Sequence, residues 1–398
     1  MKPTSRVAPL DTDPRDYRIA YNISRYICRR AFRCLLRHPL HHSSMFSSLL
    51  TPVKRCLKFG RSSRVADLKD ARRRSIRLMA KKDDVPWKLD EPFWQPCHSW
   101  SGGSWYQAWG FEQQHRDQNF TSALDRPRKL ALYSWNIDFM LPFAESRMRA
   151  AIGHLHDLVQ KQSPDTVSVI LLAECVESDV ELISSDSWVR DTFQLTDLDG
   201  THWQSGHYGT MTLIDRRLPI EQCFRIHYSK SRMERDGLFV DIVLGGEKTV
   251  RLCNTHLESL ALQPAFRPPQ VQLCASYMHD PAVSGAILAG DLNAIEEFDK
   301  HLHSDNGLKD AYLELGGEED DAKGHTWGQQ AATHLRDRFG TTRMDKIFFR
   351  GDLLCSSFEL FGQGIEVTDV SEREDIVGMG FDKPWITDHF GIKGLFEI

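Results

Sequence analysis

The sequence contains no uninterrupted apolar run of eighteen or more residues, the length that a helix needs to cross a bilayer. Its longest largely apolar stretches, such as residues 167–173 and 286–289, have the length of strands. We therefore expect no membrane span. Cysteine pairs spaced as CxxC are also missing, and the nine cysteines are scattered and odd in number. This pattern argues against a disulfide framework and a structural zinc site, and it favours a reducing compartment.

Acidic residues are absent between Arg18 and Arg64. Residues 1–85 hold 21 Lys and Arg against 7 Asp and Glu, a net charge of about +14, so the rest of the chain carries about −19. We expect residues 1–85 to be a disordered or targeting extension, or the product of translation upstream of the true start. The basic cluster at residues 69–82 is typical of nuclear localisation or nucleic-acid binding. We expect the nucleus, with the mitochondrion or the cytoplasm as alternatives.

The remaining chain divides into a linker and one large domain. Residues 86–128 are rich in Trp, Pro, Gly and Ser without periodicity, which predicts a linker. Residues 129–398 carry a regular pattern and are expected to form one domain, acting as a monomer. Strands are predicted at residues 129–137, 166–174, 208–214, 237–244, 249–257, 285–293 and 343–351, and helices at 144–162 and 269–279. Because strands dominate and helices are irregularly spaced, packed sheets flanked by helices are favoured over a βαβ barrel.

Polar residues recur where the predicted strands end. They are Asn136, Glu174, His256 with Glu258, Asp291 with Asn293, and Asp388 with His389 near the C-terminus. Neighbouring strands lie about 4.8 Å apart, so residues distant in sequence can meet at one edge of a sheet. Carboxylate and amide oxygens suit a hard cation such as Mg²⁺, and histidines can donate to phosphoryl oxygens.

These segments resemble, in their order, the signature of the endonuclease/exonuclease/phosphatase superfamily. The matching segments are SWN at 134–136, Glu174 after an apolar strand, NTHLES at 254–259, GDLN at 290–293 and TDH at 387–389. HTWGQQ at 325–330 and RMDKIFFRG at 343–351 are similar to segments of the 5′-tyrosyl-DNA phosphodiesterases within that superfamily. The resemblance implies an α/β fold of the α+β type: a two-sheet β-sandwich flanked by helices, the four-layer DNase I-like fold, with residues 129–398 as catalytic domain.

The resemblance also implies a Mg²⁺-dependent phosphodiesterase, with Mn²⁺ as an alternative ion, that acts on single-stranded 5′ DNA ends carrying a tyrosyl adduct during repair. Glu174 is expected to be the principal metal ligand, helped by Asn136 and Asp388. Asp291 is expected to act as general base or to position water, Asn293 to hold the geometry, and His389 to stabilise charge while oriented by Asp345. The residues expected to contact substrate are His256, Ser259, Arg235 and Trp327, the last by stacking on a base or on the leaving group.

Two other functions stay open at this point. The first keeps the metal chemistry on another phosphodiester or phosphomonoester: abasic-site DNA, RNA, an inositol phosphate or a phospholipid head group. Ala294 and Ile295 favour it, because they follow GDLN where the tyrosyl-DNA enzymes carry a basic residue. The second is a nucleic-acid-binding relative that retains only the fold, and the complete set of expected catalytic residues disfavours it.

Overall fold

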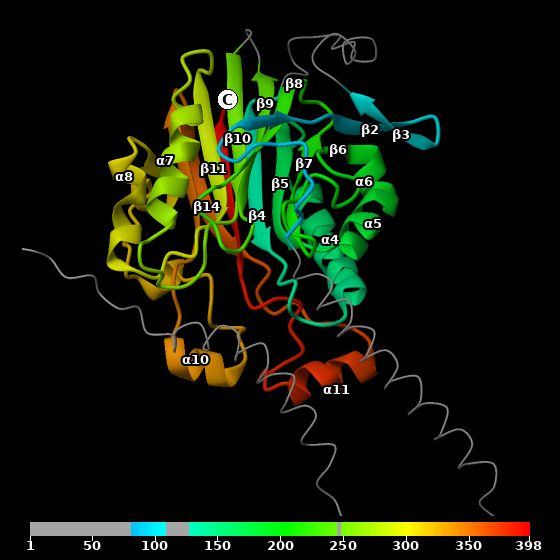
Figure 1. Cartoon of the computed structure of the whole chain (residues 1–398). Coiled ribbons are helices and arrows are strands. Elements are labelled where there is room, and N and C mark those ends of the chain that lie inside the picture. Colours follow the sequence, from blue (N-terminus) through cyan, green and yellow to red (C-terminus); the bar gives the residue numbers. More distant parts are fainter. Residues whose placement is uncertain (1–80, 109–126, 245–247) are drawn as a thin grey trace, which may run out of the picture. The chain divides into compact units, whose positions relative to one another are not determined.

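The structure is a computed structural model that describes residues 81–108, 127–244 and 248–398. The predictions of targeting or disorder for the basic extension lie almost wholly outside these residues. Figure 1 shows two sheets packed face to face with helices on their outer sides. No helix in the described residues combines the length and the apolar character that crossing a bilayer requires.

Fifteen strands of the described residues form two mixed sheets. A seven-stranded sheet has the order β1-β8-β9-β10-β11-β13-β12. Its members are β1 (Pro92–Trp94), β8 (Ile220–His227), β9 (Asp236–Leu244), β10 (Lys248–Thr255), β11 (Gly285–Asp291), β12 (Lys309–Asp310) and β13 (Asp345–Gly351). An eight-stranded sheet has the order β14-β15-β4-β5-β7-β6-β2-β3. Its members are β2 (Cys97–Ser101), β3 (Ser104–Ala108), β4 (Lys129–Asn136), β5 (Thr166–Cys175), β6 (Phe193–Leu195), β7 (Gly209–Asp215), β14 (Leu354–Phe361) and β15 (Gly391–Glu397).

Helices follow several of these strands. They are α4 (Ala144–Gln160), α5 (Glu177–Ser185), α6 (Ser187–Thr192), α7 (Arg267–Met278), α8 (Leu302–Asp305), α9 (Ala311–Glu314), α10 (Thr333–Phe339) and α11 (Val370–Gly378), with short 3₁₀ turns η2 (Glu297–His301) and η3 (Ala322–Gly324). Each strand predicted from the sequence has a counterpart within two residues of its expected ends, as do the two predicted helices.

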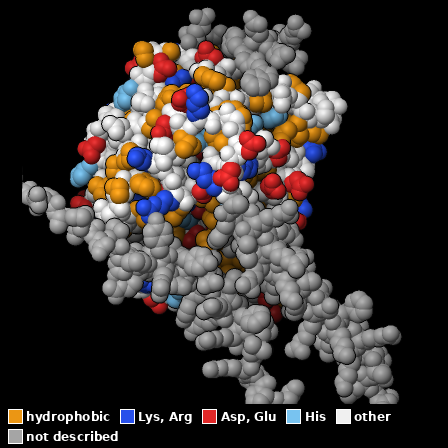
Figure 2. Space-filling model, in the orientation of Figure 1, with side chains coloured by type: hydrophobic (Ala, Val, Ile, Leu, Met, Phe, Trp, Pro, Cys, Tyr) orange, Lys and Arg blue, Asp and Glu red, His pale blue; other side chains and the backbone are white. Residues whose placement is uncertain are grey.

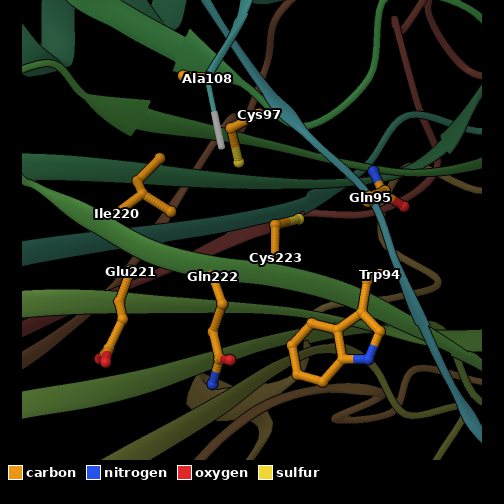
Figure 3. A pocket seen from close by; sticks show the side chains of 8 residues that line it. All are labelled: Trp94, Gln95, Cys97, Ala108, Ile220, Glu221, Gln222 and Cys223. Atoms are coloured by element: carbon orange, nitrogen blue, oxygen red, sulfur yellow. The ribbon is translucent and has the colours of Figure 1, made fainter. Parts of the chain in front are cut away.

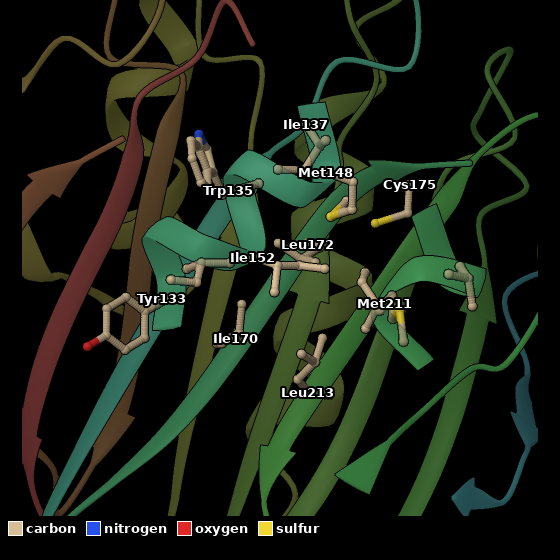
Figure 4. Packing of buried hydrophobic residues seen from close by; sticks show 14 of the residues in the cluster. Tyr133, Trp135, Ile137, Met148, Ile152, Ile170, Leu172, Cys175, Met211 and Leu213 are labelled. Atoms are coloured by element: carbon tan, nitrogen blue, oxygen red, sulfur yellow. The ribbon is translucent and has the colours of Figure 1, made fainter. Parts of the chain in front are cut away.

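Successive side chains of each strand point to opposite faces of the sheet, and this divides the apolar core into layers. In β4, Leu130 and Leu132 enter the apolar cluster between the two sheets, whereas Ala131 and Tyr133 enter the cluster beneath α4. Figure 4 shows this second cluster, in which Met148 and other apolar residues of α4 lie over the outer face of β4, β5 and β7. Because successive side chains of a strand point to opposite faces, a strand that is apolar at every position must be covered on both sides.

The outer face of the seven-stranded sheet is covered in the same way by α7. Val271 and Cys274 of this helix pack with Phe239 of β9 and Leu288 of β11 in a third apolar cluster. The order helix, sheet, sheet, helix therefore gives four layers. The predicted helix-flanked two-sheet sandwich is confirmed.

The segment expected to be a linker is instead partly built into the sheets. β1 pairs antiparallel with β8, and β2 joins β6 through His98 and Leu195 while pairing with β3 along its length. The interpretation as a linker was wrong for residues 92–108. Its cause is visible in the sequence: these short strands carry Trp, His and Gln side chains whose partners lie a hundred residues away, so no apolar alternation marks them.

A buried ionic network fastens this added segment to the domain. Arg225 of β8 is fully buried and donates to Asp236 at 2.8 Å and to Asp197 at 3.0 Å. Its Nε also donates to Gln95 Oε1 at 3.3 Å, just after β1. A buried guanidinium is stable only when its N–H groups have acceptors. Because Gln95 is one of the acceptors of Arg225, this contact holds the added segment in place.

We expect Arg225→Ala to lower the free energy of unfolding by about 3–5 kcal/mol, because the substitution leaves two buried carboxylates without their cation. Urea unfolding followed by circular dichroism measures this. The matched control is Lys88→Ala, which removes an ion pair whose side chains are 79% and 59% exposed and which should change stability by less than about 1 kcal/mol. Equal effects of the two substitutions would contradict the role given to Arg225.

Candidate active site

The candidate site lies where parallel strands of both sheets end together. β4 runs parallel to β5, and β10 runs parallel to β11, so Asn136, Glu174, His256 and Asp291 are delivered to one edge. In Figure 1 this is the lower edge, on the side where α10 and α11 lie. Asp345 begins the antiparallel strand β13 directly opposite Asp291. The topology thus gathers residues that are up to 209 positions apart, from Asn136 to Asp345.

Asp291 is the centre of the hydrogen-bond network. Asn136 Nδ2 donates to Asp291 Oδ2 at 3.0 Å, and the backbone N–H of Asn293 donates to Oδ1 at 2.8 Å. The Nε2 atoms of His256 and His389 lie 3.3 Å and 3.6 Å from the same Oδ2. Although burial acts in the opposite direction, these two imidazoles hold the pKa of Asp291 well below its usual range. The carboxyl group is therefore ionised at neutral pH.

His389 carries the complementary charge. Its Nδ1 lies 2.8 Å from Asp345 Oδ2, the carboxylate expected to orient it. Burial acts to lower the pKa of His389, but Asp345 and Asp291 together raise it well above the usual range. The imidazolium form therefore prevails at neutral pH, with its Nε2–H directed toward the space beside Asp291.

The backbone of the site is held in an uncommon conformation at three of its residues. Asp138, Glu174 and Asn293 have φ values of 57°, 62° and 48°, in the left-handed region that side chains disfavour. Such residues cost about 1–3 kcal/mol each and persist only where the surroundings fix them. Here the backbone N–H of Phe139 donates to Glu174 Oε2 at 3.0 Å, and Asn293 Nδ2 donates to the Leu257 carbonyl at 3.0 Å.

Arg147 of α4 supplies much of this fixation. The guanidinium is fully buried and donates to five backbone carbonyls, those of Ile137, Asp138, Leu141, Pro142 and Ile386. It thereby joins the loop after β4 to the chain that leads into Asp388. Gly290 serves a similar purpose in β11, since a Cβ atom there would lie 1.7 Å from the Thr255 carbonyl oxygen. Only glycine lets β11 approach the segment that carries His256.

Sequence reasoning missed Asp138. Burial, followed by repulsion from Asp388, raises the pKa of this carboxyl to about 7, and Glu174 adds to the effect while Arg147 opposes it. Burial likewise raises the pKa of Asp388, with Glu174 and Asp291 adding to it and His389 and Trp327 opposing. Three carboxyl groups thus repel one another at one place. The signal available in the sequence was the position of Asp138 two residues after Asn136, at the same strand end.

These donors fit a divalent metal ion, which would neutralise the repulsion among the three carboxylates. Their hard oxygen atoms are the ligands that Mg²⁺ prefers. Among the described residues, Asp291, Asp345 and His389 have one donor atom each within 4.8 Å of the others. In that group Nδ1 and Oδ2 already form the hydrogen bond between His389 and Asp345. The mutually repelling carboxylates of Asp138, Glu174 and Asp388 are the other donors that could hold an ion.

The residues expected to contact substrate lie around this centre in different ways. The Arg235 guanidinium donates to His256 Nδ1, which leaves the ring proton of His256 on Nε2, and it lies 5.0 Å from the centre of the Tyr208 ring. Trp327 donates its indole N–H to Asp388 Oδ2 at 2.7 Å. Ser259 follows His256 by three residues in the sequence and is partly buried. Its expected contact with phosphate stays a prediction.

An aromatic wall next to these residues was not expected from the sequence. The rings of Phe139 and Tyr208 are stacked 4.2 Å apart, and the Tyr208 ring lies 6.5 Å from that of His256. Tyr208 is further fixed by donating to the Met233 carbonyl at 2.7 Å. The wall comes from the loop after β4 and from the entry to β7, two segments that only the tertiary fold brings together.

Comparison with known proteins gives the class. The model of the endonuclease/exonuclease/phosphatase family matches residues 133–389, which is more than half of the sequence, and the chain belongs to that family. Members of this family hydrolyse phosphodiester or phosphate esters. No curated protein matches the sequence significantly.

Solved structures with the same fold include TDP2 from two animals. Truncated TDP2 of Caenorhabditis elegans is 23% identical with a TM-score of 0.51, over 68% of this chain and 98% of that one. TDP2 of D. rerio, in complex with a single-strand DNA product, is 19% identical with a TM-score of 0.52, over 68% of this chain and 99% of that one. The similarity at these identities shows a TDP2-like fold.

Proposed function

We propose that this chain is a Mg²⁺-dependent phosphodiesterase that releases tyrosine from 5′-phosphotyrosyl ends of single-stranded DNA. The observation that carries the proposal is the convergence of two imidazole Nε2 atoms on Asp291 Oδ2, at 3.3 Å and 3.6 Å, beside the carboxylates of Glu174 and Asp388. A phosphoryl group placed beside these rings would meet the His389 imidazolium and the Nε2–H of His256, while a bound cation would offset the neighbouring carboxylates, as in-line displacement at phosphorus requires.

Each residue of the centre has a separate task. Asp291 accepts hydrogen bonds from Asn136 and from the backbone of Asn293, so it can orient the water that adds to phosphorus. Because the pKa of Asp291 is held so low, positioning of water suits it better than removal of a proton. His389, as the imidazolium, and His256, through Nε2–H, donate to the non-bridging oxygens as negative charge grows. The water oxygen bonds to phosphorus, the bond from phosphorus to the tyrosine oxygen breaks, and the proton that the water loses ends on the departing phenolate, which gives free tyrosine and a 5′-phosphate.

Glu174, Asp138 and Asp388 would hold the metal ion, with Asn136 close by. Bound there, the ion would neutralise charge on the phosphate and polarise it. Asn136 was expected to contribute its side-chain oxygen, but this atom accepts a hydrogen bond from the Asp138 backbone N–H at 2.9 Å. We therefore give Asn136 mainly the task of holding Asp291 and the Asp138 loop. Mn²⁺, which accepts the same oxygen ligands, should replace Mg²⁺.

The aromatic wall supports tyrosine as the leaving group. Phe139 is partly exposed and is backed by the buried ring of Tyr208, which lies beside His256 and under the Arg235 guanidinium. A phenolic leaving group can pack against such a surface, whereas a sugar or an inositol gains little from it. The single-stranded DNA in the similar TDP2 structure favours a nucleic acid on the other side of the phosphate, with Trp327 as a stacking platform. We also propose that the protein acts as a monomer in the nucleus.

One observation favours a different phosphate ester as substrate. Ile295 is 39% exposed at the end of the GDLN segment, where a cation would contact a nucleic-acid backbone. Figure 2 also shows both signs of charge interspersed on the described part of the face it presents, without an extended basic surface there. An abasic-site DNA, an RNA, an inositol phosphate or a phospholipid head group is therefore the second candidate.

Steady-state kinetics on a panel of substrates separates the two candidates. We expect kcat/KM to be highest for a 5′-phosphotyrosyl oligonucleotide, and at least tenfold lower for the 3′-phosphotyrosyl, abasic-site, RNA and inositol phosphate substrates. Tyr208→Ala should lower kcat/KM for the tyrosyl substrate more than for the same oligonucleotide carrying an alkyl leaving group. Preference for any of the other substrates would move the proposal to the second candidate.

Metal affinity should depend on pH through Asp138. A carboxyl group whose pKa is about 7 is protonated below that pH, and a proton competes with the metal for its oxygens. We expect Mg²⁺ to bind roughly tenfold more weakly at pH 6 than at pH 8, as one proton is displaced. Isothermal titration calorimetry measures both affinities, and Asp138→Asn should abolish most of the difference. An affinity that does not change between these pH values would contradict the assignment of Asp138.

A further inference from the structure

A cavity that contains no residue of the proposed active site lies beside the strands that precede the matched family region. Residues 92–108 lie before the matched region 133–389, yet they add β1 to one sheet and β2 and β3 to the other. A cavity of about 540 Å³ opens between these strands and the loop after β6. Its lining includes Phe93, Trp94, His98, Gln107, Asp199 and His202. None of these residues takes part in the proposed reaction.

The walls of this cavity are aromatic. Trp94 is 51% exposed, and the Phe93 ring lies 5.6 Å from the ring of His202 in a tilted arrangement. Trp94 also lines a smaller cavity of about 190 Å³, into which Cys97 and Cys223 point (Figure 3). A large apolar ring that borders two cavities and stays half exposed offers a face for a flat or cationic group.

The charged side chain that lines the cavity is a carboxylate. Among the described residues no Lys or Arg lines it, whereas the exposed carboxylate of Asp199 does. His98 is 8% exposed, and burial lowers its pKa although Asp197 acts in the opposite direction, so the ring is neutral at pH 7. Within the described chain, His98 Nδ1 has no hydrogen-bond partner. The cavity therefore repels phosphate and suits a cation that donates hydrogen bonds.

The rim of the cavity already attracts a cation of this chain. Lys82 Nζ donates to the carbonyl oxygens of Gly200 and Thr201, next to Asp199. Within the described residues, β3 is an edge strand of the eight-stranded sheet. Its residue Gln107 also lines the cavity. A strand edge offers backbone donors and acceptors to an extended peptide.

We propose that this cavity binds the guanidinium group of an arginine in an extended peptide of a partner protein. The planar guanidinium stacks on Trp94 and donates to the Asp199 carboxylate, while the peptide backbone runs along β3. Guanidinium fits better than ammonium because it combines a flat face with five donors in one plane. This site is independent of the proposed phosphodiesterase activity.

The test is a titration of the full chain with labelled pentapeptides, followed by fluorescence anisotropy. The probe is an acetylated and amidated Gly-Ser-Arg-Ser-Gly, and the control replaces arginine by citrulline, which keeps the shape and removes the charge. We expect saturable binding of the arginine peptide and at least roughly tenfold weaker binding of the citrulline peptide. A lysine peptide should lie between the two.

Matched variants assign the binding to this cavity. Trp94→Ala and Asp199→Asn should each weaken binding of the arginine peptide by roughly tenfold, while Phe339→Ala and Asp352→Asn, which alter an exposed aromatic and an exposed acid outside the cavity and outside β3, should not change it. Phosphodiesterase activity should stay unchanged in all four. Equal affinity for arginine and citrulline, no saturation at millimolar peptide, or indifference to Trp94→Ala and Asp199→Asn would each overturn the proposal.

Discussion

Asp291→Asn is expected to reduce kcat by about a thousandfold or more while the domain remains folded. The substitution keeps the shape of the side chain but removes the negative charge that His256 and His389 face at 3.3 Å and 3.6 Å. An amide would also present a donor where the carboxylate accepts hydrogen bonds from Asn136 and the Asn293 backbone. The water that attacks phosphorus would lose its orientation, and the His389 imidazolium would lose one of its neighbouring carboxylates.

The measurement combines single-turnover kinetics with circular dichroism. Asp352→Asn makes the same chemical change at an exposed position and should retain full activity. Because the pKa of Asp291 is depressed in the folded state, its charge stabilises the protein above the pKa of the unfolded chain, and this contribution disappears as pH falls. Asp291→Asn should therefore lower the free energy of unfolding at pH 7, and the difference should narrow only as pH approaches the low pKa of folded Asp291. Turnover near that of the unaltered protein would remove Asp291 from the mechanism.

Glu174→Gln is expected to reduce kcat/KM by at least a hundredfold at fixed Mg²⁺ and to weaken Mg²⁺ binding. Glu174 ends the buried strand β5 in a left-handed conformation, and its Oε2 fixes the loop that carries Asp138 through the Phe139 N–H. Glutamine can still accept that hydrogen bond, so the loop should keep its place. The loss then reports on the charge that holds the ion.

Raising the Mg²⁺ concentration should restore part of the activity of Glu174→Gln, whereas it should not restore Asp291→Asn. The matched control is Glu177→Gln, three residues further on at the exposed start of α5, which should behave like the unaltered protein. If Glu174→Gln and Glu177→Gln have equal kcat/KM and equal Mg²⁺ affinity, the metal site lies elsewhere, and the group of Asp291, Asp345 and His389 becomes the alternative.

Much of the site could be anticipated because strand ends are visible in the sequence. The apolar run of β5 ends at Glu174, and the run of β11 ends at Asp291, so each polar residue stands out against an apolar strand. The order of these segments then placed them on one sheet edge. His389 and Asp345 form a hydrogen bond, and each belongs to a segment, TDH or RMDKIFFRG, that was already identified from the sequence.

The rest depends on tertiary structure that no local pattern records. Asp138 acquires its raised pKa from burial and from repulsion by Asp388, which is 250 positions away, and its carbonyl is held by the buried Arg147 of α4. Tyr208 and Phe139 meet only because β7 lies beside β5 in the sheet. Strands β1 and β2 pair with partners far along the chain, β3 pairs with β2, and all three lack apolar alternation, so a linker was the natural interpretation of their sequence.

The roles of two residues change once the geometry is known. Asn136, expected to bind the metal, has both ends of its amide engaged, one with Asp291 and the other with the Asp138 backbone. Trp327, expected to stack on a base, has its indole N–H committed to Asp388, so it also orients a carboxylate of the metal site. In both cases the side chain connects two functional residues, which a sequence pattern cannot reveal.

The most direct test of the account is the release of tyrosine from a 5′-phosphotyrosyl single-stranded oligonucleotide, measured with Mg²⁺ and again after addition of EDTA. We predict release of tyrosine with Mg²⁺, no release with EDTA, and recovery when Mg²⁺ or Mn²⁺ is added back. Release that persists in EDTA would contradict the metal chemistry. No release under any of these conditions, in a preparation that hydrolyses another phosphate ester, would contradict the proposed substrate.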